Sequence, residues 1–173
     1  MRPLFIILLS VFVLSQGRSQ SHLTLKYTGS NNNVAGAVQK ANEILNSTSF
    51  YEQIRKIAKF DHSSLTGQQV ADRIQSASQQ IRVVRKIKPI ANASTKTSDK
   101  IKISRSLFGL DSTGKFVLSI AVNTLIHETV HAVDFLNTGN EFTHDGNRSD
   151  GQENTAPWMI GDIAERMVLE NRQ

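Results

Sequence analysis

The 173-residue chain contains no cysteine, and this absence excludes several classes of small protein. A disulfide-stapled miniprotein, a zinc finger built on cysteine ligands and a cysteine protease all need thiols. Hydrophobic residues make up 39% of the chain and charged residues 20%. Disordered and collagen-like chains are poorer in apolar residues, so both are excluded as well. The length then predicts one globular domain of roughly 150 residues.

The chain also lacks an apolar run long enough to span a bilayer. Residues 4–14 are apolar apart from one serine, about half the length that a membrane-spanning helix needs. Arg2 precedes this run and small residues follow it, which is typical of a cleaved secretory signal. We therefore predict a signal peptide over residues 1–19 and a single domain over residues 20–173. The protein is expected to be secreted or periplasmic, with no membrane attachment after cleavage.

Aromatic residues are scarce, at 6%, although one half of the chain is strongly basic. Residues 51–110 carry 12 Lys and Arg against 4 Asp and Glu, whereas residues 111–173 carry 4 against 10. A basic region indicates nucleic-acid binding mainly when aromatic residues are interleaved with the charges. That pattern is missing here, so we interpret the basic half as a solvated face and predict no nucleic-acid partner. The acidic half favours binding of a divalent cation.

Hydrophobic periodicity predicts an α+β domain. Alternating or continuous apolar residues predict strands, and apolar residues spaced by three and four predict helices. We expect the second and third strands to pair as a hairpin across a polar loop at residues 92–100. The predicted strands cover residues 23–27, 81–90 and 101–108, and the predicted helices cover residues 34–45, 50–60, 66–74, 116–136 and 153–170.

Residues 127–131 read His-Glu-Thr-Val-His, in the second half of the predicted helix 116–136. Histidines at positions i and i+4 project from one face of a helix, so His127 and His131 can bind one zinc ion. Zinc lowers the pKa of a bound water toward about 7. Glu128 is placed to take a proton from that water without being a ligand. The pattern predicts a hydrolytic zinc site with Glu128 as general base.

These five residues and their helical setting resemble the zincin family of zinc metallopeptidases. The resemblance covers residues 122–162 and implies that His127 and His131 are zinc ligands and Glu128 is the general base. It also implies a zincin-like α+β fold, in which a small sheet packs on the active-site helix with further helices. The stretch 100–107 would then be the strand nearest the cleft, offering its backbone to an extended substrate.

The third zinc ligand separates the subfamilies of zincins. The metzincin pattern requires Gly and His three and six residues after the second histidine, where this chain has Asp and Asn. The gluzincin pattern supplies a Glu from a following helix, and Glu153 at the start of the predicted last helix fits that pattern. The alternative ligand is His144, and an aspzincin-like ligand, Asp145 or Asp150, is a further possibility. Glu153 is the ligand that we expect from the sequence.

The sequence therefore favours a secreted Zn²⁺-dependent metallopeptidase, expected to be an endopeptidase that hydrolyses peptide bonds in proteins. Its partner would be a protein or peptide substrate, and we expect a monomer. The competing hypothesis is a secreted zinc-binding module with zincin ancestry that is catalytically inactive or acts on something other than peptides. Retention of Glu128 favours the enzyme, since a structural zinc does not need a general base.

Overall fold

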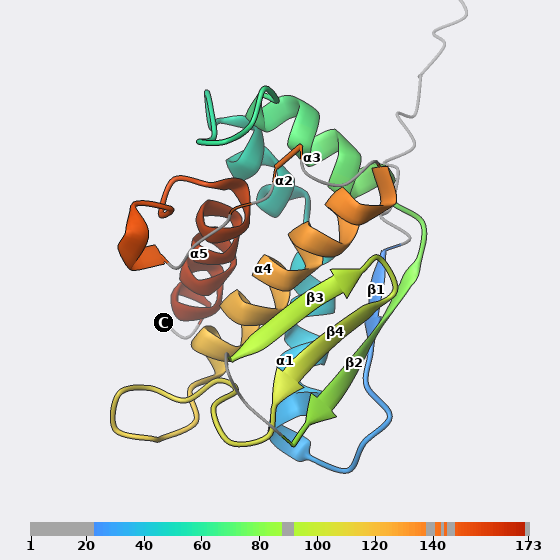
Figure 1. Ribbon diagram of the computed structural model, residues 1–173, viewed down its shortest axis with the longest axis vertical. Helices are drawn as coiled ribbons and strands as arrows, with labels where there is room; N and C mark the ends of the chain where they lie inside the picture. The colour runs from blue at the N-terminus through green and yellow to red at the C-terminus, as the bar shows by residue number, and fades with distance from the viewer. Residues whose placement is uncertain (1–22, 88–91, 138–140, 143, 145–147, 172–173) are drawn as a thin grey trace, which may run out of the picture.

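The computed structural model describes residues 23–87, 92–137, 141, 142, 144 and 148–171, so the predicted signal peptide lies outside it. Within these residues the fold is α+β, as predicted, with one small mixed sheet and five α-helices (Figure 1). The strands are β1 (Thr24–Lys26), β2 (Gln80–Lys86), β3 (Ala93–Thr97) and β4 (Lys100–Ser104). The helices are α1 (Asn32–Leu45), α2 (Thr48–Arg55), α3 (Gly67–Ser76), α4 (Leu118–Asn137) and α5 (Ala156–Glu170), with a short 3₁₀ turn η1 (Arg148–Asp150).

The sheet has the strand order β1-β2-β4-β3, and this order corrects two predictions. β2 and β4 are neighbours but run parallel, so the predicted hairpin between them is wrong. The segment predicted as a polar loop forms β3, which pairs antiparallel with β4. Its Ser, Thr and Lys residues suit an edge strand, where one face and one backbone edge are not buried in the sheet. Tertiary pairing therefore outweighs the polar composition of this segment.

The same order corrects the strand expected nearest the cleft. β4 pairs with β2 on one side and with β3 on the other, so its backbone groups are occupied within the sheet. β3 is an edge strand, and it packs against α4. Among the described strands next to α4, β3 is therefore the one with an unpaired edge.

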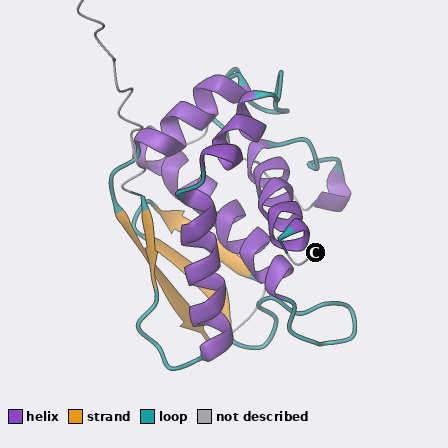
Figure 2. Cartoon of the chain, turned by 180° about the vertical axis from the view of Figure 1, so that it is seen from behind, coloured by secondary structure: helices purple, strands orange, loops and turns teal. Residues whose placement is uncertain are grey.

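Helices lie against one face of the sheet, and Figure 2 views the molecule from the helical side. The inward residues of the sheet, among them Ile81 and Ile101, are fully buried in one core with the apolar faces of α1 and α4. Most of α4 is buried because the sheet and α1 pack on it from one side and α5 from another. Of the described helices, none is both long enough and apolar enough to cross a membrane.

The close approach of α4 and α5 depends on a glycine. A Cβ atom added at Gly161 would lie 2.7 Å from Oδ1 of Asn123 on α4, closer than real Cβ contacts. The buried Asn123 amide donates to the carboxylates of Asp162 (3.1 Å) and Glu165 (2.8 Å) on α5. Since α5 begins only at Ala156, the predicted helix start at 153 is wrong by three residues. A proline is tolerated in the first turn of a helix and not further inside it, and Pro157 lies in the first turn of α5.

Candidate metal centre

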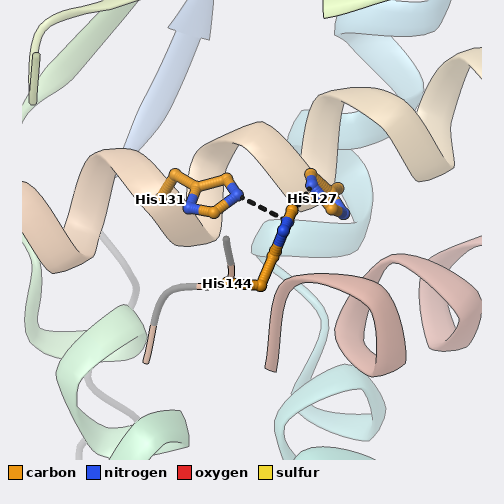
Figure 3. A group of neighbouring side chains, drawn as sticks. All are labelled: His127, His131 and His144. Atoms are coloured by element: carbon orange, nitrogen blue, oxygen red, sulfur yellow. Dashed lines mark hydrogen bonds between the residues drawn. The ribbon is translucent and has the colours of Figure 1, made fainter. Parts of the chain in front are cut away.

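Two of the predicted metal ligands lie on α4, one helical turn apart. The rings of His127 and His131 lie edge to face, with their centroids 5.0 Å apart. His127 is 6% exposed and His131 is partly buried. The helix therefore brings the two imidazoles to one place, as their spacing requires. Figure 3 shows both rings on the same side of α4.

The third histidine comes from the connection between α4 and η1. The Nε2 atom of His144 lies 3.1 Å from Nε2 of His127 and 3.1 Å from Nε2 of His131 (Figure 3). The potential ligand atoms of the three residues all lie within 4.8 Å of one another. These three residues form the histidine cluster, and its third member lies 13 residues after His131 in the sequence.

The donor set of the histidine cluster fits a metal ion better than hydrogen bonds alone. A neutral imidazole carries only one N–H, and both close contacts use the same Nε2 atom of His144. A single proton there does not give two separate well-formed hydrogen bonds. Three lone pairs aimed at one tetrahedral zinc ion would be about 3.3 Å apart, given Zn–N bonds of about 2.0–2.1 Å. The two Nε2–Nε2 distances from His144, both 3.1 Å, are close to that value.

Burial keeps the histidines in the form that binds metal. Burial lowers the pKa of His127 well below the ordinary value, and the neighbouring His131 and His144 lower it further. Burial, followed by the effect of His144, lowers the pKa of His131 to about 4. Both rings are therefore neutral at neutral pH, so a metal ion does not have to displace a proton from them.

Glu128 follows His127 directly on α4 and is 7% exposed. Burial raises its pKa to about 7, and the hydroxyl of Thr95 on β3 opposes that rise. The Thr95 hydroxyl has no hydrogen-bond partner of good geometry among the described residues. Its interaction with Glu128 is therefore not a well-aligned hydrogen bond. A carboxyl with a pKa near 7 both accepts and releases a proton at neutral pH, which suits a general base.

The loop that carries His144 is anchored just before that residue. The buried side chain of Asp134 accepts a hydrogen bond from the backbone N–H of Glu141 (3.1 Å). The Glu141 carboxylate pairs with Arg73 on α3, and Phe142 is fully buried in the core. The segment therefore enters the cluster from a fixed point, and Asp134 is a structural acceptor inside the protein and not a solvated carboxylate.

We expect Asp134→Ala to weaken zinc binding about tenfold, because loss of the Glu141 anchor loosens the loop that holds His144. Asp134→Asn keeps an acceptor oxygen and should bind zinc nearly as wild type does. Competition with a chromophoric chelator gives both affinities, and melting of the metal-free variants separates loss of the site from loss of the fold. Unchanged zinc affinity in Asp134→Ala would contradict this role.

Trp158 on α5 forms one wall of the histidine cluster. Its ring lies 4.2 Å from that of His127, edge to face, and 5.6 Å from that of His144, stacked. The Arg148 guanidinium lies 5.8 Å from the Trp158 ring and pairs with Asp162 through two hydrogen bonds of 2.9 and 2.6 Å. Because Asp162 belongs to the same helix as Trp158, this ion pair fixes the far end of the loop to α5.

Glu153, the third ligand expected from the sequence, is not brought to the two α4 histidines. Its exposed side chain lies in the turn before α5, and the group of potential metal ligands among the described residues contains His144 instead. The helix that was to aim Glu153 starts three residues later than predicted. Of the other candidates, Asp150 is exposed in η1, and Asp145 lies outside the described residues.

Sequence reasoning missed three residues that surround the site. Thr95 lies in the segment predicted as a loop, and the position of Phe142 gave no periodic signal. Trp158 had one available signal, since it is the only tryptophan of the chain and lies in the predicted last helix.

Comparison with known proteins found no relative on which to base a function. No family model, curated protein or solved structure matches the chain.

Proposed function

We propose that the protein is a zinc-dependent metallopeptidase of the zincin type, with His127, His131 and His144 as ligands. One observation carries the proposal: three imidazole nitrogens converge on one point, and the residue that follows the first of them on α4 is a buried glutamate. Glu128 follows the first ligand directly, and the two α4 ligands are four residues apart, as in the zincin motif. Zinc is the metal that we expect, because three imidazoles and an open fourth position are a common catalytic zinc site.

Each residue has a defined task in this proposal. A bound zinc ion would polarise the scissile carbonyl and lower the pKa of the attacking water. The carboxylate of Glu128 accepts the proton of that water and later delivers it to the leaving amine nitrogen. Burial supports the second step, since a carboxyl with a raised pKa holds the proton until it is transferred to the leaving nitrogen as the C–N bond breaks. Trp158 and the core around α4 keep bulk water away from the histidines.

The edge strand β3 is the element that we propose to hold the substrate. An extended peptide adds to an exposed sheet edge through backbone hydrogen bonds. β3 packs on α4, and the hydroxyl of its residue Thr95 lowers the pKa of Glu128. A peptide paired with β3 would therefore lie beside the proposed general base. This arrangement favours a protein or peptide substrate bound in extended form, as in an endopeptidase.

The test uses the single tryptophan as a reporter of metal binding. Because Trp158 contacts two of the three proposed ligands, Co²⁺ added to metal-free protein should quench its fluorescence by at least about half, with one ion per chain. His131→Ala leaves both Trp158 contacts in place and should lose the saturable quenching. The zinc-loaded protein should also cleave members of a mixed peptide library.

The two readouts separate the candidate functions. Quenching with one metal ion per chain but no peptide cleavage would favour the zinc-binding module without peptidase activity. Quenching that is equal in wild type and His131→Ala would overturn the metal site itself. Export to the periplasm or outside the cell and a monomeric state remain predictions from the sequence, with analysis of secreted fractions and light scattering as their tests.

A further inference from the structure

The face of the sheet turned away from the helices carries a row of basic side chains. Residues that alternate with buried ones along each strand point to this outer face, which is toward the viewer in Figure 1. On β1, β2 and β4 the alternation places five cations there, which we call the basic sheet face: Lys26, Arg82, Lys86, Lys100 and Lys102.

The register brings these cations close together. Lys26 is the cross-strand partner of Arg82, and Arg82 is the partner of Lys100, so one row crosses three strands. Neighbouring strands are about 4.8 Å apart, and residues two apart on one strand are separated by about 6.6 Å. Lys102 follows Lys100 at that second spacing. Lys86 has Ser104 as its cross-strand partner and lies diagonal to Lys102, at about 7–8 Å. The result is a connected strip of positive charge and not a set of scattered surface lysines.

The basic sheet face does not serve the stability of the fold. Like charges on directly opposed residues of a sheet are destabilising. Among the described residues, Arg82 has one acidic partner, Asp99 at 2.8 Å, and no ion pair to a described acid neutralises the four lysines. The strip therefore keeps an excess of about four positive charges. Charge complementarity then predicts an anionic partner.

The chemistry of the strip selects among anionic partners. No aromatic side chain accompanies the cations on these three strands, so bases of single-stranded nucleic acid have no stacking surface. Four of the five cations are lysines, which bind anions as point charges, unlike the planar fork of arginine. A twisted sheet also presents a diagonal strip and not a plane, which suits a narrow chain better than a bilayer.

We propose that the basic sheet face binds a linear sulfated polysaccharide. Closely spaced sulfate groups on one flexible chain match cations about 5 to 7 Å apart without demanding a defined geometry at each contact. Helix α4, which carries two of the three cluster histidines, packs on the opposite, helical face of the sheet, so a polysaccharide on the basic sheet face would not contact that helix. The proposal goes beyond the proposed peptidase function and does not depend on it.

The experiment measures binding of a heparin decasaccharide to the full chain by calorimetry in 50 mM NaCl. The test variant Lys26→Gln/Lys100→Gln/Lys102→Gln removes three charges from the basic sheet face. The matched control Lys56→Gln/Lys59→Gln/Lys115→Gln removes three exposed lysines from other elements and has the same net charge. We expect at least about tenfold weaker binding by the test variant and less than about threefold by the control. The slope of log Kd against log salt concentration should also be smaller by roughly 2 to 3 in the test variant alone.

Two further measurements keep the result interpretable. The melting temperature of the test variant should equal or exceed that of wild type, because neutralisation relieves repulsion between Lys100 and Arg82. Equal weakening in both triple variants would overturn the proposal, since net charge alone would then explain binding. Tighter binding of wild type to single-stranded DNA or to phosphatidylserine vesicles than to the decasaccharide would overturn it as well.

Discussion

Glu128→Gln should lower the rate of peptide hydrolysis by about 10²–10⁴-fold while zinc remains bound. Glu128 follows His127 on α4 and is buried, and an amide at this position would accept no proton from water at neutral pH. A positioned general base contributes about 10²–10⁴-fold to a rate, so its loss should dominate the kinetics. The metal content is expected to stay at one zinc per chain, because the three imidazoles are untouched. Fluorogenic peptide cleavage and metal analysis on the same sample measure both quantities.

A matched control separates this effect from a general effect of a lost carboxylate. Glu170→Gln removes an exposed acid at the end of α5 and should keep wild-type activity. The fold of Glu128→Gln should be at least as stable as that of metal-free wild type above pH 7, because its buried amide carries no charge. Near-wild-type hydrolysis by Glu128→Gln would rule out the proposed general base, whatever the metal content.

The helical part of the fold could be read from the sequence because its signals are local. The apolar spacing of residues 116–136 is close to the observed α4, and Thr66 with Gln69 forms the capping box that starts α3. Two of the three cluster histidines followed from the same local rule, since residues four apart on a helix share a face. No knowledge of the rest of the chain was needed for these features.

The sheet could not be read in the same way, because strand pairing joins distant residues. Ile81 and Ile101 gave clear strand signals, but their segments are nearest neighbours in a parallel pair that no local signal specifies. β3 has mostly polar residues because it is an edge strand, so its composition is like that of a loop. The strand most relevant to a substrate was therefore the one with the weakest sequence signal.

The third proposed ligand was ambiguous for the same reason. His144 lies in a connection without periodicity, and its position is fixed by contacts to distant elements. Arg73 on α3 holds Glu141, the core holds Phe142, and Asp162 on α5 holds Arg148. None of these pairings can be derived from spacing along the chain, whereas Glu153 matched a familiar spacing. Tertiary anchoring of the loop, and not the length between ligands, favours His144.

His144→Ala is therefore expected to weaken zinc binding by more than about 100-fold, whereas Glu153→Ala should keep wild-type affinity. His144 contributes a nitrogen 3.1 Å from each of the other two histidines, and its removal leaves two protein ligands. Loss of a residue that only orients a ligand costs about 10–100-fold in metal affinity, so loss of a ligand should cost more. Glu153 has an exposed side chain outside the cluster, and its removal takes no ligand away.

The measurement is competition for zinc with a chelator of known affinity, together with the absorption of the Co²⁺ form. Three nitrogen ligands and a water give a four-coordinate spectrum, which His144→Ala should lose and Glu153→Ala should retain. His144→Gln is the control for packing against Trp158, because it keeps a polar side chain of similar length. The opposite pattern, with zinc lost only on removal of Glu153, would show that the loop rearranges when metal binds and that the ligand set is His127, His131 and Glu153. The role of Glu128 as general base would be unaffected by that outcome, since it depends on α4 alone.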